Sequence, residues 1–210
     1  MSLRNALLGA AAVTVALSAQ AFAAPITPGS QLNINGFDIG IGSSTIDQAT
    51  GLDFTSATLA PSPGTAGVLS AVSGTPGGSF AGISCSSNCG SIQDIADFAS
   101  FAPIAGFYET SAAAGDITFD LNSITNITRV AGSSTSLATL IISGTGIFHF
   151  AGFDASPGIF TLTTQGGNST TFSASSIATA GQTVPEPMTL ALFGAGLLGL
   201  GGLMRRRRNS

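Results

Sequence analysis

Alternation of apolar and polar residues is the feature that most constrains the fold of this chain. It runs through residues 32–41 (LNINGFDIGI), 116–121, 124–130 and 147–153. Successive side chains of a strand point to opposite faces of a sheet, so a period of two predicts half-buried strands. Turn signals of Gly, Asn and Pro follow one another at intervals of about 8 to 12 residues. The pattern predicts a mainly β chain that folds as a single β-sandwich with Greek-key or jelly-roll-like connections.

Composition agrees with a packed domain and excludes some classes of protein. Of the 210 residues, 44% are hydrophobic, 8% are charged and 28 are glycine. The hydrophobic share is enough to bury a core, and the absence of a Gly-X-Y period excludes collagen. Six basic residues cannot supply the phosphate-neutralising surface of a nucleic-acid-binding protein.

One short helix is expected in residues 91–98 (SIQDIADF). Ser91 could cap its first turn, and Asp94 stands near the third position, where a carboxylate completes a capping box. Residues 56–79, rich in Pro and Gly, are expected to form long loops around a short apolar strand at 68–72.

The first 23 residues have the pattern of a secretory signal peptide. Arg4 precedes an apolar run over residues 6–19, and Ala21 and Ala23 flank Phe22. Small residues at these two positions predict cleavage by signal peptidase after Ala23. The alternative is an uncleaved anchor, but the run is shorter than the roughly 20 residues that span a bilayer.

A second exported-protein pattern lies near the other end of the chain. Pro185, Glu186 and Pro187 precede seventeen apolar or small residues at 188–204, which would make a helix of about 26 Å. By the positive-inside rule, a basic cluster beyond this predicted transmembrane helix stays in the cytoplasm. Everything before Pro185 would therefore lie outside the cytoplasm. The cluster is Arg205, Arg206, Arg207 and Arg208.

This order of elements resembles the PEP-CTERM sorting signal over residues 184–210. The resemblance implies that exosortase, a membrane-embedded enzyme similar to a cysteine transpeptidase, recognises Pro185, Glu186 and Pro187 and removes the helix and basic tail. Proteins of this family come from Gram-negative bacteria that usually make exopolysaccharide. The mature chain would be released or transferred to a surface or matrix acceptor. The Leu-Pro-x-Thr-Gly element of a sortase signal is missing, and the alternative is a plain single-span membrane protein.

The chain thus divides into a signal peptide at 1–23, an exported all-β domain at 24–175, a linker at 176–184 and the sorting signal at 185–210. Residues 24–184 contain nine acidic residues and one basic residue, Arg129, which gives a formal charge of −8. Such a domain repels anionic lipid and nucleic acid.

Cys85 and Cys89 are the two cysteines of the chain. In an oxidising compartment outside the cytoplasm they are expected to form a disulfide that closes a small loop. A metal pair or a redox site is the alternative, but further zinc ligands are absent and the spacing is not Cys-x-x-Cys.

Residues that could carry catalysis are sparse. His149 is the only histidine; with flanking Phe148 and Phe150 toward the core it would lie on the outer face of a sheet. A Ser-His-Asp triad could recruit it with Asp116 or Asp154, but no Gly-x-Ser-x-Gly element is present.

Two other kinds of site depend on carboxylates. A glycosidase needs two of them across a cleft, and one Tyr and no Trp leave little aromatic surface for a sugar ring. The candidates are Asp94, Asp97, Glu109, Asp116 and Asp120. Calcium could bind Asp38, Asp47 or Asp53 in polar turns, but no EF-hand spacing is present. No metal or other cofactor is expected.

The sequence therefore predicts a non-enzymatic exported protein with a structural or adhesive role in the envelope or an extracellular exopolysaccharide matrix. Its precursor would be anchored in the inner membrane before it reaches the cell surface or the medium. Expected partners are signal peptidase, an exosortase-like transpeptidase, the membrane and exopolysaccharide. The alternative is a secreted polysaccharide-binding module or hydrolase.

Overall fold

The computed structural model describes residues 23–56, 61–112, 115–167 and 169–181. Almost all regular structure in these ranges is β, and a 3-10 turn at η1 is their only helix. The chain is thus mainly β, as the alternation predicts. The elements are β1 (Ala24–Pro25), β2 (Gln31–Ile41), η1 (Ile46–Gln48), β3 (Gly51–Thr55), β4 (Gly67–Gly74), β5 (Ser84–Cys85), β6 (Gly90–Ile92), β7 (Ile104–Thr110), β8 (Ile117–Val130), β9 (Thr139–Phe150), β10 (Phe153–Asp154), β11 (Ser156–Gln165) and β12 (Ser169–Ala178).

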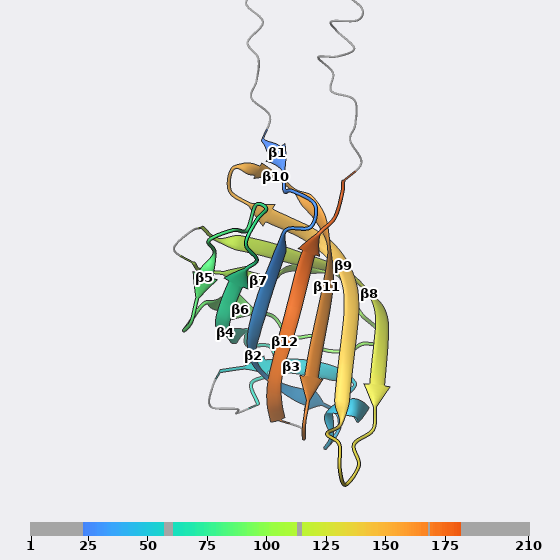
Figure 1. Cartoon of the computed structure of the whole chain (residues 1–210). Coiled ribbons are helices and arrows are strands. Elements are labelled where there is room, and N and C mark those ends of the chain that lie inside the picture. Colours follow the sequence, from blue (N-terminus) through green and yellow to red (C-terminus); the bar gives the residue numbers. More distant parts are fainter. Residues whose placement is uncertain (1–22, 57–60, 113–114, 168, 182–210) are drawn as a thin grey trace, which may run out of the picture.

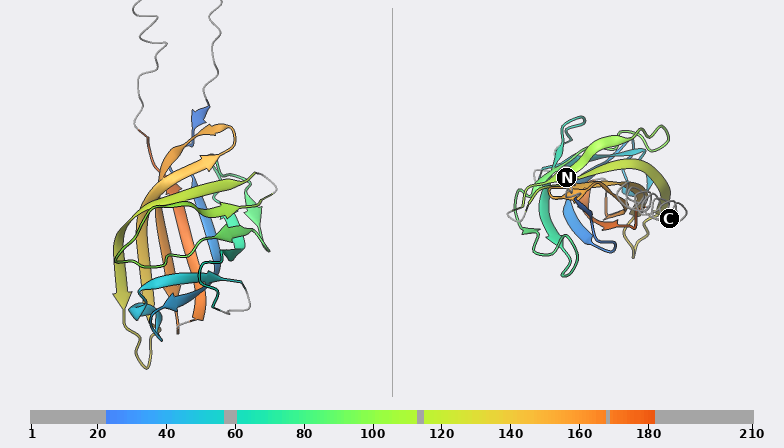
Figure 2. Two further views of the ribbon diagram at one scale, coloured as in Figure 1. Left: turned by 180° about the vertical axis from the view of Figure 1, so that it is seen from behind. Right: turned by 90° about the horizontal axis from the view of Figure 1, so that it is seen from above.

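The main sheet closes on itself. Its strands pair in the order β2, β12, β11, β9, β8, β7, β6 and β4, and β4 pairs again with β2. Every pairing in this ring is antiparallel. Figure 1 shows β2, β12, β11, β9 and β8 side by side, and Figure 2 shows the strands arranged around a common centre.

The closed eight-stranded barrel replaces the expected sandwich. Apart from the short β3, β5 and β10, each strand of the ring lies beside the next strand in the sequence, which is an up-and-down order and not a Greek key. The prediction was wrong at this level because alternation along a strand is the same in both folds. Only the long-range pairing of β2 with β4 and β12 distinguishes them.

Aromatic rings fill the barrel. Phe119 packs against Phe148 with ring centroids 4.8 Å apart and stacks on Tyr108 at 5.3 Å. Glycines on neighbouring strands leave room for the rings: a Cβ on Gly158 would lie 2.4 Å from a ring carbon of Phe148, and one on Gly146 2.5 Å from Phe119. Small residues beside large ones allow a narrow barrel to be packed throughout.

The helix expected at 91–98 is absent, and this prediction was wrong. Ser91 belongs to β6, and Ile95 forms a bridge with Leu52 of β3. The backbone N–H groups of Leu52 and Ile95 each donate to the other residue's carbonyl, at 2.8 and 2.9 Å. Because the segment pairs with β3, its backbone stays extended, and the weak local helical signal is overridden.

Two strand boundaries also differ from expectation. The two strands expected at 116–121 and 124–130 form one strand, β8, in which register shifts mark bulges near Leu121 and Ile124. β12 continues to Ala178, so the first three residues of the expected linker belong to the barrel. The strand expected at 68–72 lies within β4.

Several expected segments lie outside the described residues. They are the signal segment up to residue 22, including Ala21, the sorting motif, the helix expected at 188–204 and the arginine cluster. Within the ranges that are described, no helix has the length and apolar character needed to cross a membrane.

Candidate functional site

Both ends of the described chain leave the barrel at the same pole, which we call the exit pole (Figure 1). β1, which follows directly on the expected cleavage site at Ala23, pairs in parallel with β10. The Ile26 N–H donates to the buried Ser156 hydroxyl at 2.9 Å. At the other end of the chain, the Thr179 N–H donates to the Pro157 carbonyl at 2.8 Å. The two ends that carry the predicted export signals are therefore held beside one another.

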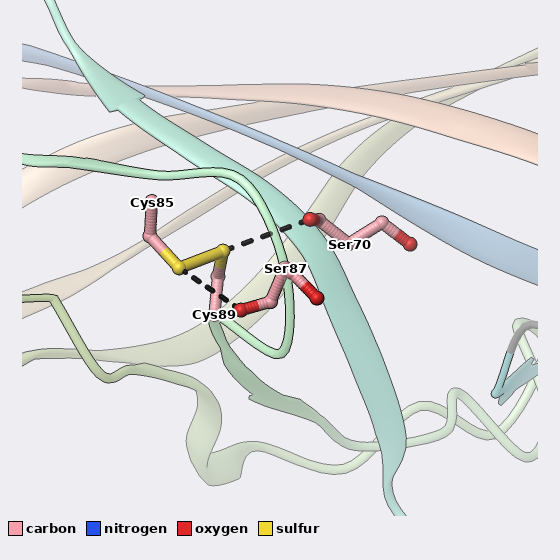
Figure 3. The surroundings of a disulfide bond; sticks show 4 residues. All are labelled: Ser70, Cys85, Ser87 and Cys89. Carbon is pink, nitrogen blue, oxygen red and sulfur yellow. Dashed lines mark hydrogen bonds between the residues drawn. A yellow bond between two sulfur atoms is a disulfide. The ribbon is translucent and has the colours of Figure 1, made fainter.

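The two cysteines form the expected disulfide, which closes a small loop between β5 and β6 (Figure 3). The Cα atoms of Cys85 and Cys89 are 5.5 Å apart. Cys89 is fully buried, and its sulfur lies 3.6 Å from the Ser70 carbonyl of β4. A bonded sulfur has no proton to donate, so this is a packing contact. The disulfide fixes the loop against the barrel wall and leaves no free thiol for metal or redox chemistry.

Four carboxylates gather on the side of the barrel formed by β6, β7, β8 and the segment after β6. We call this side the acidic wall and define it by Asp94, Asp97, Glu109 and Asp120. Asp94 and Glu109 line one groove of about 450 Å³. Asp94 and Asp97 line an adjoining hollow of about 410 Å³. The structure thus brings four of the five proposed glycosidase carboxylates to one side, while Asp116 is an exposed residue just before β8.

Asp94 holds two separate segments of backbone. One of its carboxylate oxygens accepts the Phe54 N–H of β3 at 2.9 Å, and the other accepts the Gly64 N–H at 2.7 Å. Burial raises the pKa of Asp94 above its ordinary value, and the two N–H donors partly oppose that rise. A raised pKa suits a general acid, but here both oxygens are occupied by the protein's own backbone.

Asp97 and Asp120 also accept hydrogen bonds from the protein. Asp97 accepts from the Ser100 hydroxyl at 2.7 Å and the Ala99 N–H at 2.8 Å. The Ser100 bond is the main cause that lowers the pKa of Asp97. One oxygen of Asp120 accepts the Gly106 N–H of β7 at 2.7 Å.

His149 lies on the outer face of β9, as predicted from its buried neighbour Phe148. Its Nε2 lies 2.8 Å from the second oxygen of Asp120, which is neither of the aspartates considered for a triad. No serine in the described part of the chain hydrogen-bonds to the ring. The pair therefore links β8 to β9 on a surface where the imidazole is 48% exposed.

The three aspartates considered for calcium lie apart and do not form one site. Asp38 is buried inside the barrel and accepts from the Thr164 hydroxyl at 3.0 Å. One oxygen of Asp53 accepts the Ser62 N–H at 2.8 Å. Asp47 lies in η1, and a hydrogen bond from the Gln48 amide lowers its pKa. Across the described ranges, no three His, Cys, Asp or Glu side chains are grouped so that they could hold a metal ion.

Asp38 is the most perturbed carboxyl group among these candidates. Burial raises its pKa to about 7, although the Thr164 hydrogen bond acts in the opposite direction. Its second oxygen is buried without a hydrogen-bond partner. A neutral, protonated carboxyl suits such a site because an unpaired buried charge is far more costly.

Arg129 is the single basic side chain of residues 24–184. Its Nη1 donates to the Asp47 carbonyl at 2.6 Å, and its guanidinium lies 5.7 Å from the centre of the Phe98 ring. It thereby joins η1 and the segment after β6 to the end of β8. Its role in the structure is to hold these segments together.

The comparisons with known proteins concern the region beyond the barrel. No curated protein and no solved structure matches the chain. The PEP-CTERM protein-sorting motif matches residues 183–208, which confirms the resemblance seen in the sequence. This motif implies that the chain is an exosortase substrate, which crosses the membrane and is sorted to the cell surface. The match begins two residues beyond Gly181, the last described residue, so the chain is an eight-stranded barrel joined to a PEP-CTERM sorting motif.

Proposed function

We propose that this protein is a non-enzymatic component of the cell surface or extracellular matrix, delivered there by its PEP-CTERM motif. In this proposal signal peptidase cuts after Ala23, and the C-terminal helix holds the precursor in the inner membrane. Exosortase then acts at Pro185, Glu186 and Pro187. The observation that carries the proposal is the motif match directly after the barrel.

The position of the chain ends supports this delivery. Pro185 is four residues beyond Gly181, the last described residue, and an extended chain covers at most about 3.6 Å per residue. Chain length alone therefore limits Pro185 to about 14 Å from Gly181. A tether this short would hold the exit pole toward the membrane and the sorting enzyme, and it would leave the side walls of the barrel facing outward.

The structural or adhesive role is supported by how the barrel's charged groups are used. Both oxygens of Asp94 accept backbone N–H groups, Asp120 is bound to Gly106 and His149, and Arg129 joins three segments. These groups stabilise the folded domain. The competing function from another class is a polysaccharide hydrolase, which the groove between Asp94 and Glu109 favours.

One experiment tests delivery. Replacing Glu186 with Ala in the full chain is expected to leave a membrane-retained precursor, because the acidic centre of the motif is lost. Gln182→Ala, just before the motif, is the matched control and should be processed normally. Mass spectrometry of the surface or medium fraction gives the answer. A wild-type surface form that still extends to Ser210 would contradict the proposal.

A second experiment separates the two classes of function. The wild-type protein is incubated with the exopolysaccharide of its host, and new reducing ends are counted. We expect none above background. Release of reducing ends that is lost in Glu109→Gln would establish the hydrolase and overturn the non-enzymatic role.

A further inference from the structure

Six small polar side chains lie on the outer face of three adjacent strands. Along β2, β12 and β11 successive side chains alternate between the core and the outer face, except for the buried run at residues 38–40 of β2. We call the polar outward side chains in the middle of these strands the hydroxyl face. It consists of Asn33, Asn35, Ser173, Ser175, Thr161 and Thr163.

The sheet register aligns these side chains in two rows across the strands. Ser175 pairs with both Asn33 and Thr161. In the next row, Ser173 pairs with both Asn35 and Thr163. No register shift interrupts β2–β12 or β11–β12. Each row therefore repeats a small hydrogen-bonding group at the strand spacing of about 4.8 Å.

Most of these groups are not used by the protein. In the described part of the chain, Asn33 accepts from the Gln31 amide, and the other five side chains have no hydrogen bond. All six line one hollow of about 300 Å³ on the barrel surface. The Ser175 hydroxyl is buried without a partner, so the groups of this face that are fully open to a ligand are those of Asn35 and Ser173, with Thr161 and Thr163 half-buried beside them.

The charge distribution decides what kind of molecule fits. No outward position on β2, β11 or β12 carries a charged residue. The exposed carboxylates lie elsewhere, at positions such as Asp97, Glu109 and Asp154. A nucleic acid or an anionic polymer would find no cation here. A second copy of the domain would bring another formal charge of −8 close to the first.

An apolar pair borders the polar rows. Ile159 of β11 and Ile177 of β12 are cross-strand partners, and they are 48% and 39% exposed. They lie on the same outer face as Thr161 and Ser175, and each is two residues nearer the exit pole along its strand. Sugar rings combine hydroxyl edges with apolar C–H faces, so a polar row beside exposed isoleucines matches both features of such a ring.

We propose that the hydroxyl face binds an uncharged polysaccharide across β2, β12 and β11. The inference deepens the proposed matrix role and rests on it. The free Ser, Thr and Asn groups bind the hydroxyls of successive sugar units, while Ile159 and Ile177 cover a ring face. Without aromatic stacking each contact is weak, and attachment depends on many contacts along one polymer chain.

The test is retention on immobilised polymers. The protein is purified from the medium or, where it stays in the membrane, in detergent. It is then passed over cellulose, amylose and the anionic polymer alginate. Wild type should be retained on cellulose or amylose and not on alginate. The variant T161V/T163V/S173A/S175A should lose at least tenfold in retained amount while its circular dichroism spectrum is unchanged.

Two further variants keep the result interpretable. Ser173→Arg places bulk and charge at an exposed position of the hollow, so it should abolish retention without affecting the core. Ser111→Ala combined with Asp97→Asn alters exposed groups off the face and should bind as wild type does. Failure of wild type to bind either neutral polymer, stronger binding to alginate, or equal binding of the face variants would overturn the proposal.

The same preparations separate this proposal from the one on delivery. A protein that is processed normally but shows no polymer binding refutes the hydroxyl face alone. A protein that binds neutral polymer but remains an unprocessed membrane form refutes the delivery step alone. If the face variants change the oligomeric state in light scattering and not the binding, the occupant is a second copy and the proposal is wrong.

Discussion

The acidic wall and the hydroxyl face use their side chains in opposite ways. On the hydroxyl face, β11 has eight register pairs with β12 and ten with β9, and β12 pairs with β2 without a shift. The one register shift lies at the edge of the face, where β2 pairs with β4. On the acidic wall, β6 has two register pairs with β4 and three with β7, and β7 shifts register against β8. Carboxylates complete the backbone hydrogen bonding there. Side chains are thus hydrogen-bonded within the protein where the ladders are short, and most of them are free where the ladders are long.

Because the side chains of the acidic wall already have partners, the hydroxyl face is the better candidate for a binding surface. Carboxylates and histidine are the usual candidates for chemistry, yet Asp94, Asp120 and His149 each have partners within the protein. The free hydrogen-bonding groups belong to residue types that rarely attract notice, such as Ser173 and Thr163. Chemical type alone would direct attention to the wrong side of the barrel.

The largest expected loss of stability from a substitution comes from removing the central carboxylate of the acidic wall. Asp94→Ala leaves the N–H groups of Phe54 and Gly64 without their acceptor, and the expected loss in the free energy of unfolding is about 3 kcal/mol. Asp97→Ala is the control, because its two partners lie within three residues of it on the surface. Its expected loss is much smaller, because water can replace the carboxylate as the partner of exposed groups. Urea unfolding measures both, and equal losses would mean that Asp94 does not hold the wall together.

The second prediction concerns Asp38, the one carboxylate on the strands of the hydroxyl face, which points into the barrel. Its pKa in the folded protein is about 7, against an ordinary value of 3.8. The folded chain therefore holds this proton more tightly than the unfolded chain does. Stability relative to Asp38→Asn is expected to fall as the pH rises from about 4 to about 7. The total change is on the order of 4 kcal/mol.

Unfolding at several pH values checks this dependence. Below pH 4 the two proteins should differ little, and above pH 7 the variant should be the more stable. Asp97→Asn on the acidic wall should behave with the opposite sign. The pKa of Asp97 is lowered, so its contribution is present above its ordinary pKa and is lost as the pH falls. A flat difference between wild type and Asp38→Asn would show that Asp38 is ionised in the folded barrel.

The two regions also differ in how far the sequence predicts them. Alternation locates β2, β11 and β12 because each long strand has one face toward the core. The closure of the barrel has no such local signal, since it depends on β4 reaching β2. On the acidic wall the helix expected at 91–98 gives way to a bridge between Ile95 and Leu52. Tertiary hydrogen bonds decide the conformation of that segment.

The candidate sites follow the same rule. The sorting motif and the disulfide are predictable because their residues are close together in the sequence. The partner of His149 is not, since Asp120 lies on another strand 29 residues away. The repeats Asn33-x-Asn35, Thr161-x-Thr163 and Ser173-x-Ser175 are visible in the sequence. Only the register shows that they form rows.

The smallest expected effect tests whether the hydroxyls of the face are free. Ser173→Ala removes an exposed hydroxyl that has no hydrogen bond in the described part of the chain, so stability should change by less than about 0.5 kcal/mol. Ser156→Ala makes the same change at a buried position on β11. There the hydroxyl accepts the Ile26 N–H and donates to the Asp154 carbonyl, both at 2.9 Å. Its loss should cost about 1 to 3 kcal/mol, because the buried N–H is left unpaired.

Thermal and urea unfolding of the two variants, measured side by side, gives the stability lost in each. If Ser173→Ala costs as much as Ser156→Ala, the hydroxyl face is part of the barrel's own bonding and is not available to a partner.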